Sequence, residues 1–279
     1  MYYIVSLSGG TQSAVSAERA LERYGAGQVW LAICDTKNEH DDLWRFHHDC
    51  MERWRKVYGV TKCHVFADGR DPYQLAEQKS LIPNQYLAPC SNDLKREVLL
   101  KWLWRVPKPV TVLLGYSWNE QHRIERRRRW HRQTGGKGWK RPSGYHFEVP
   151  GVYEDYPLTW EPWDMRECTA IVQSEWGIEP PLMNRLGFSH NNCGKYGCVK
   201  WGIEDSQRFA HFFPEQHEWR KQWEKRMREK GGSLANRTFL RDQSGGTVTP
   251  LTLEELELRP KPDFSKPIQQ DLFSCFCTY

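Results

Sequence analysis

The chain has 279 residues, of which 27% are charged and 39% hydrophobic, and its formal net charge at pH 7 is +5. This length is enough to bury a large core, so we expect one sizeable α/β domain or a domain with an appendage. No apolar run approaches the length of a bilayer span, and the short apolar N-terminus lacks the basic segment of a secretory signal. The composition therefore excludes an integral membrane protein, and we expect a cytoplasmic one.

The first half of the chain alternates short apolar segments with helical patterns. The expected strands are Tyr2–Leu7, Val29–Cys34, Lys62–Phe66 and Val110–Leu114. Between them, residues 41–58 and 91–104 carry apolar side chains at helical spacing. Such alternation predicts a parallel sheet with right-handed crossovers and helices on both faces. Ligands bind these sheets beyond the carboxyl ends of the strands.

The second half of the chain is dominated by helical patterns. Asp164 and Glu167 form a capping pattern before an apolar stretch, and Pro214 is placed to begin a long helix within residues 205–230. We expect an α/β domain over residues 1–160, with a basic and aromatic insertion at about 123–150. A helical, cysteine-containing C-terminal region is expected over residues 161–279.

A glycine-rich turn, Ser8-Gly9-Gly10-Thr11-Gln12-Ser13, follows the first expected strand and precedes a helical stretch. Backbone N–H groups in such a turn point at one spot, and the helix dipole adds partial positive charge there. The turn therefore predicts a phosphate site, with an ordinary tight strand-to-helix turn as the alternative. It is not a Walker loop, because no Gly-Lys-Ser/Thr follows at the required spacing.

The turn resembles the PP-loop of the ATP pyrophosphatase superfamily, whose usual form is SGGxDS. Members of that family cleave ATP between the α and β phosphates and adenylate a substrate. Ser8, Gly9, Gly10 and Ser13 match the pattern, whereas Gln12 stands where the family usually has Asp. An amide is a poorer ligand than a carboxylate for a hard cation. The resemblance therefore implies that another carboxylate, such as Asp35, assists a magnesium ion.

Three further segments resemble the phosphoadenosine phosphosulfate (PAPS) reductase-like branch and follow the family's order. Asp35 lies in a segment similar to DTGxE, Cys90 and Lys95 match a Cys-x-x-x-x-Lys helix start, and Glu120 and Arg123 follow the fourth strand. The resemblance implies that Asp35 faces adenosine or a metal and that Glu120 lies on the nucleotide side of the pocket. It also implies that Lys95 and Arg123 stabilise charge developing at phosphorus. The alternatives are a capped loop at Asp35 and a surface salt bridge between Glu120 and Arg123.

The nine cysteines are an odd number, which favours metal or thiol chemistry over a disulfide framework. Residues 186–200 resemble the GFSxNNC…CVK segment of PAPS reductase-like proteins, which is common among phage and mobile-element members. Cys193 and Cys198 flank a glycine-containing loop, so both thiolates can point inward while backbone amides donate to the site.

A bound cluster or zinc needs more ligands than these two cysteines, and Cys90, Cys275 and Cys277 are the candidates. The sequence predicts an iron–sulfur cluster of the 4Fe–4S type, with zinc as the alternative. We expect four other cysteines to lie in the core: Cys34, Cys50, Cys63 and Cys168.

The segment Arg126–Arg141 interleaves basic and aromatic side chains. This combination suits a phosphate backbone with stacked bases and predicts contact with nucleic acid. The alternative is a solvated basic loop.

The resemblance implies an adenine nucleotide alpha hydrolase-like fold, in which residues 1–160 are the PP-loop nucleotide-binding domain. It also implies an enzyme that binds ATP with Mg²⁺ and adenylates a substrate with release of pyrophosphate. Several relatives then deliver sulfur to nucleic acid, including DNA phosphorothioation enzymes, which implies a sulfur-donor protein as a partner. The amides of Gly9, Gly10 and Thr11 would hold pyrophosphate, and Ser8 and Ser13 would add hydroxyl donors. Two alternatives stay open: a sulfonucleotide reductase, and a non-catalytic nucleotide- or nucleic-acid-binding protein with a structural zinc site.

Overall fold

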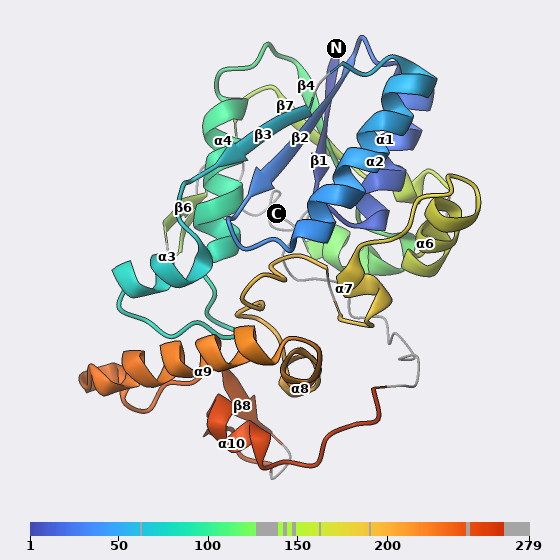
Figure 1. Cartoon of the computed structure of the whole chain (residues 1–279). Coiled ribbons are helices and arrows are strands. Elements are labelled where there is room, and N and C mark those ends of the chain that lie inside the picture. The colour runs from blue at the N-terminus through green and yellow to red at the C-terminus, as the bar shows by residue number, and fades with distance from the viewer. Residues whose placement is uncertain are drawn as a thin grey trace.

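The computed structural model describes residues 1–61, 63–126, 149–161, 163–189, 191–243 and 246–264 in full, and the backbone of residues 139–141 and 144–146. Its centre is a five-stranded sheet in the order β3-β2-β1-β4-β7, in which all neighbouring strands are parallel (Figure 1). The strands are β1 (Tyr2–Leu7), β2 (Val29–Asp35), β3 (Cys63–Ala67), β4 (Val110–Leu114) and β7 (Val152–Asp155).

Helices cover both faces of the sheet (Figure 1). The helices α1 (Thr11–Tyr24), α2 (Asp41–Tyr58) and α6 (Met165–Ser174) contribute to the core on one face, together with Val5 and Ile33. On the other face, α4 (Glu97–Leu103) packs with Ile4 and Val112. Neighbouring residues of one strand thus enter opposite cores, as the alternation of side chains along a strand requires. The predicted parallel α/β sheet with helices on both faces is confirmed.

The ends of α2 show why the local sequence forms this helix. Asp41 and Asp42 occupy its first turn, and the imidazole of His40 accepts a hydrogen bond from the Asp42 amide. Acidic residues are favourable there because they face the positive end of the helix dipole. Gly59 ends the helix with φ +73, a left-handed conformation that glycine adopts readily. The helix predicted over residues 41–58 is confirmed.

Several elements differ from the sequence prediction. The second strand extends one residue further, to Asp35. The third strand is shifted by one residue, to Cys63–Ala67. The segment predicted as one helix over residues 91–104 begins as a π-helical turn, η1 (Ser91–Arg96), and continues as α4. Strand β7 was not predicted, because it pairs with β4 at the edge of the sheet and its residues are not an apolar run.

The predicted C-terminal helical region is present. In its described part, the helices besides α6 are α7 (Leu182–Arg185), α8 (Ile203–Phe212), α9 (Pro214–Glu229) and α10 (Leu253–Glu257). A short hairpin of β8 (Leu240–Asp242) and β9 (Thr249–Leu251) follows α9. Pro214 is the first residue of α9, as predicted, and Asp164 and Glu167 form the predicted capping box of α6. Shorter elements elsewhere in the described residues include α3 (Pro72–Gln78), η2 (Trp118–Glu120), β5 (Trp139–Arg141), β6 (Gly144–His146), η3 (Pro157–Thr159) and η4 (Gly232–Leu234).

The boundary at residue 160 stays a prediction. Helix α6 lies beyond it and contributes Cys168 and Val172 to the same core as α1 and α2. In Figure 1, helices α7, α8 and α9 lie beside the carboxyl edge of the sheet, so the C-terminal region adjoins the predicted ligand edge. In the part of the chain that the structure describes, no helix has the length and apolar character needed to cross a bilayer.

Candidate functional site

The glycine-rich turn leads from β1 into α1 at the carboxyl edge of the sheet. Gly9 has φ +84, and a Cβ built on it would lie 2.7 Å from the Cδ2 atom of Leu43, so both the backbone and the space require glycine. Gly10 is the N-cap of α1 and provides no side chain to cap the first turn, which also contains no acidic residue. The first N–H groups of a helix lack intrahelical partners, so this turn offers donors to an anion.

The two serines of the turn shape it. The Oγ atom of Ser13 donates to the Gly10 carbonyl over 2.9 Å and accepts from the Ser8 amide over 3.1 Å. The Ser8 hydroxyl also donates to Ser13 Oγ, over 3.1 Å. The Thr11 hydroxyl lies 3.1 Å from that of Thr169 on α6. In this structure the hydroxyl of Ser13 therefore bonds within the loop, and its role as a donor to a nucleotide stays a prediction.

Charged residues gather where β2 ends. The amide of Lys37 donates to Asp35 over 2.7 Å, and its ammonium lies 2.5 Å from the same carboxylate. Burial by itself raises the pKa of Asp35, but the hydrogen bonds from Lys37 and one with Glu39 outweigh it, and the pKa is lowered. Asp35 is therefore a carboxylate already occupied by an ammonium group.

Glu39 is buried four residues beyond Asp35. It accepts hydrogen bonds from the Thr36 amide over 3.0 Å and from the Thr36 hydroxyl over 2.7 Å. Burial raises the pKa of Glu39, although the charge of Lys95 and the bonds from Thr36 act in the opposite direction. Because the Glu39 carboxyl is buried and lies beside the ionised Asp35, its protonated form is favoured.

Lys95 lies in the π-helical turn η1 and is 8% exposed. Its carbonyl accepts a hydrogen bond from the Cys34 thiol over 3.6 Å, which attaches the turn to the end of β2. Single π-turns are frequent at functional sites. The structure therefore brings Lys95 to the same sheet edge as Asp35 and Glu39, as the sequence predicted for Lys95 and Asp35.

Gln12 contacts Glu120 on the other side of the turn. Its Nε2 atom donates to a Glu120 carboxylate oxygen over 3.2 Å. Glu120 is 4% exposed and also accepts from the amide and hydroxyl of Ser117, at 2.9 and 2.8 Å. Arg123 forms an ion pair with the same carboxylate. An amide at position 12 therefore satisfies a buried carboxylate, whereas an Asp there would repel it.

The three described candidate ligands do not form one group. Cys193 and Cys198 are buried with Met183 and Phe188, whereas Cys90 is buried in a different apolar cluster. Among the described residues, no group of three or more His, Cys, Asp or Glu side chains could hold a metal ion. Cys275 and Cys277 lie outside the described residues. The described donors alone therefore do not fit a four-ligand zinc or iron–sulfur site.

Sequence reasoning did not include Glu39, Asn38 and Asn191 among the site residues. Asn38 donates to the Gly197 carbonyl over 3.1 Å, and Asn191 donates to the Gly9 carbonyl over 2.7 Å. All three are polar residues in buried positions. Each of the three lies in a run of polar residues next to a predicted site residue, and this pattern could have identified them as site residues.

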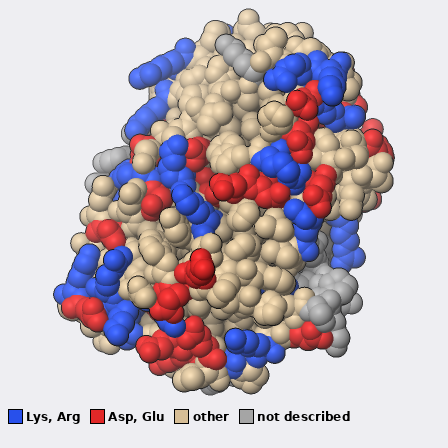
Figure 2. Space-filling view, in the orientation of Figure 1, with Lys and Arg blue, Asp and Glu red and all other residues tan. Residues whose placement is uncertain are grey.

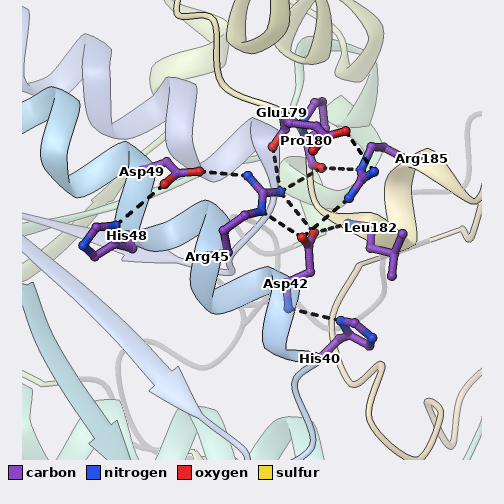
Figure 3. A network of polar contacts seen from close by, with 9 residues as sticks. All are labelled: His40, Asp42, Arg45, His48, Asp49, Glu179, Pro180, Leu182 and Arg185. Carbon is purple, nitrogen blue, oxygen red and sulfur yellow. Dashed lines mark hydrogen bonds and ion pairs between the residues drawn. The ribbon is translucent and has the colours of Figure 1, made fainter.

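A network of polar contacts holds α2 to residues 179–185, which precede the loop that contains Cys193 and Cys198 (Figure 3). Asp42 accepts a hydrogen bond from Arg45 over 2.8 Å and one from the Leu182 amide over 2.6 Å. Arg45 also donates to the carbonyl of Glu179 over 2.9 Å, and Arg185 lies 3.5 Å from Asp42. The network therefore fixes the segment that leads into residues 187–198.

Replacing Asp42 with Asn is expected to lower the free energy of unfolding by about 1–2 kcal/mol near neutral pH. Burial raises the pKa of Asp42, but the bonds from Arg45 and Leu182 outweigh it, and the pKa is lowered. A lowered carboxyl pKa contributes stability above the unfolded pKa of about 3.9, and this contribution is lost as the pH falls through the folded value. Urea unfolding at about pH 7 and about pH 3.5 measures the difference, which should shrink at the lower pH. Asp49→Asn is the control, since Asp49 is more exposed and its contacts in the network are with Arg45 and, at 3.7 Å, with His48; an equal loss in both variants would contradict the prediction.

Of the four cysteines predicted to lie in the core, three are buried. Cys34, Cys50 and Cys168 are buried, whereas Cys63 is half-buried at the edge strand β3. Burial raises the pKa of the Cys50 thiol, and it raises the pKa of Cys168 to about 12. Since the thiolate is the reactive form, these thiols are shielded both by burial and by protonation.

In the native protein, maleimide at about pH 7.5 is expected to leave Cys50 and Cys168 unmodified. The same reagent should label both in denaturant. Mass spectrometry of the peptides identifies each site. Rapid labelling of either residue under native conditions would contradict their assignment to the core.

The predicted nucleic-acid segment lies largely outside the described residues, which include Arg126 but not residues 127–138. On the face shown in Figure 2, basic and acidic side chains are interspersed. Contact with nucleic acid therefore stays a prediction.

No model of a known protein family matches this chain, and no curated protein sequence matches it. Among solved structures, it is similar to the phosphoadenylyl-sulfate (PAPS) reductase from Candida auris, which was determined as a phosphate complex. That match has 15% sequence identity and a TM-score of 0.40, and covers 67% of this chain and 78% of the other.

Proposed function

We propose that this chain is a PP-loop enzyme that binds ATP at the carboxyl edge of its sheet and adenylates an acceptor with release of pyrophosphate. The observation that carries the proposal is the uncapped glycine turn between β1 and α1, with no acidic residue in the first helical turn. Charged residues from two further elements, Lys95 and Glu39, lie at the same edge. Ordinary tight turns do not require this combination.

Each part of the site has a proposed role. The amides of Gly9, Gly10 and Thr11 would hold the β and γ phosphates, which leave together as pyrophosphate. The positive charges of Lys95 and Arg123 would stabilise the charge that develops on the phosphates during the displacement. Such preorganised charges cost no reorganisation at the moment of reaction, which makes them effective in a buried site.

Magnesium would bind mainly through the nucleotide phosphates and one or two carboxylates. Gln12 provides no carboxylate, and Glu120 is occupied by Gln12, Ser117 and Arg123. Asp35 is the proposed carboxylate ligand, with its pairing to Lys37 exchanged for the metal.

An iron–sulfur cluster, with zinc as the alternative, and sulfur transfer to nucleic acid remain further proposals. They are supported by the sequence resemblance and by the burial of Cys193 and Cys198 in one cluster. A bound cluster would supply sulfur or electrons, and the resemblance implies a sulfur-donor protein.

Pyrophosphate release tests the proposed function directly. The purified protein is incubated anaerobically with ATP and Mg²⁺, with and without DNA or tRNA, and pyrophosphate is measured by a coupled assay. We expect release that depends on the acceptor. If no nucleic acid or small acceptor elicits release, the proposal is wrong.

Two parallel measurements separate the alternatives. Sulfite release from PAPS with thioredoxin would instead indicate a sulfonucleotide reductase. Metal analysis of anaerobically purified protein distinguishes iron with sulfide, which supports sulfur transfer, from zinc alone, which supports a structural site.

A further inference from the structure

Asn191 connects the cysteine loop (residues 191–198) directly to the glycine turn at residues 8–13, which is called the phosphate turn after its proposed ligand. Its Nδ2 atom donates to the Gly9 carbonyl over 2.7 Å, and Asn191 is 7% exposed. A Cβ built on Gly10 would lie 2.9 Å from Asn191 Oδ1. The side chain therefore occupies the space beside the Gly9–Gly10 peptide that a glycine leaves open.

This contact fixes the direction in which the peptide presents its N–H group. In a trans peptide the carbonyl oxygen and the amide hydrogen point to opposite sides. With the Gly9 carbonyl held by Asn191, the Gly10 N–H faces away from Asn191. In the described part of the chain, no hydrogen bond uses this N–H.

The segment that contains Asn191 is also held by hydrogen bonds to Asn38. The side-chain amide of Asn38 donates to the Gly197 carbonyl over 3.1 Å and accepts from the Tyr196 amide over 2.9 Å. The backbone carbonyl of Asn38 accepts from the Lys195 amide over 2.9 Å. The hydroxyl of Thr36 lies 3.8 Å from Cys193 Sγ. The cysteine loop is therefore attached to the ends of two neighbouring strands, through Asn191 at the β1 turn and Asn38 after β2.

From these contacts we infer that Asn191 is a positioning residue that couples anion binding at the phosphate turn to the order of residues 191–198. An anion that binds the Gly10 N–H requires the peptide orientation that Asn191 holds. By thermodynamic linkage, the bound anion then stabilises the docked cysteine loop by the same factor. The inference rests on the proposed anion site, but not on the reaction proposed for it.

Inorganic pyrophosphate is the probe, with binding measured by calorimetry and backbone order by hydrogen exchange with mass spectrometry. In the wild-type protein, pyrophosphate should slow exchange in residues 191–198 by about fivefold or more. Asn191→Asp keeps the size of the side chain but replaces the donor with an acceptor facing the Gly9 carbonyl. This variant should bind pyrophosphate about tenfold more weakly and lose the protection of residues 191–198.

Asn236→Asp is the matched control, because it makes the same chemical change at an exposed position. It should bind and protect as the wild type does. A merely structural role for Asn191 would change the exchange of the free protein but leave the response to pyrophosphate intact, and that result would overturn the inference. Wild-type protein that does not bind pyrophosphate would also overturn it. Wild-type protein that binds and shows protection but releases no pyrophosphate from ATP would contradict the proposed reaction alone.

Discussion

Gly10→Asp is expected to abolish ATP-dependent pyrophosphate release, with a loss in rate of about 100-fold or more. The new Cβ would lie 2.9 Å from Asn191 Oδ1, so the turn could not keep its present form. The added carboxylate would also lie at the N-terminus of α1, where it would occupy the donors and repel phosphate. Pyrophosphate release and calorimetric ATP binding measure the effect.

Gly27→Asp provides the control for this substitution. It adds the same charge, but a Cβ at Gly27 would meet nothing within 4 Å. This variant should keep wild-type activity. Circular dichroism shows whether Gly10→Asp is folded, and Gly10→Ala, which adds the Cβ without the charge, provides a second measurement. Folded Gly10→Asp protein with full activity would show that the turn is not the phosphate site.

Gln12→Glu is expected to lower the free energy of unfolding by about 2 kcal/mol at about pH 8. The amide nitrogen of Gln12 lies 3.2 Å from a Glu120 carboxylate oxygen, and Glu120 is 4% exposed. A second carboxylate would replace this hydrogen bond with repulsion, which the guanidinium of Arg123 offsets in part. One of the two carboxyls would then titrate with a raised pKa.

The pH dependence of this penalty distinguishes repulsion from a packing defect. A raised carboxyl pKa causes no penalty below the unfolded value of about 4.3, and the penalty grows as the pH rises towards the folded value. The difference between Gln12→Glu and wild type in urea unfolding should therefore shrink between about pH 8 and about pH 4.5. Gln12→Leu, which removes the bond without adding charge, should show a smaller and pH-independent loss. A pH-independent penalty for Gln12→Glu would contradict the proposed repulsion.

The local parts of the fold could be predicted because they depend on neighbouring residues. The helix Asp41–Tyr58 and the strand Tyr2–Leu7 were predicted with the bounds that the structure shows. Apolar periodicity and capping residues act over a few positions, so both patterns can be recognised in the sequence alone. Strand β7 could not be predicted in this way, because its place at the sheet edge depends on pairing with β4.

The candidate site was predicted in part for the same reason. The turn at Gly9 and Gly10 requires glycine, and Lys95 and Asp35 lie at the same sheet edge. The partners of these groups were not predicted. Gln12 and Glu120 are 108 positions apart, and Asn191 and Gly9 are 182 apart. No local pattern specifies which of many polar side chains meet over such separations.

The sequence by itself determined a parallel α/β sheet, a glycine turn after its first strand, the bounds of α2 and the first residue of α9. These features follow from steric preferences and side-chain periodicity within short segments. Only the tertiary structure decided that Gln12 satisfies a buried carboxylate, that Asn191 donates to the glycine turn, and that Cys90 belongs to a different apolar cluster from Cys193 and Cys198. The physical reason is that these contacts depend on strand order and on how the C-terminal region packs against the carboxyl edge of the sheet, which long-range burial and hydrogen bonding determine together.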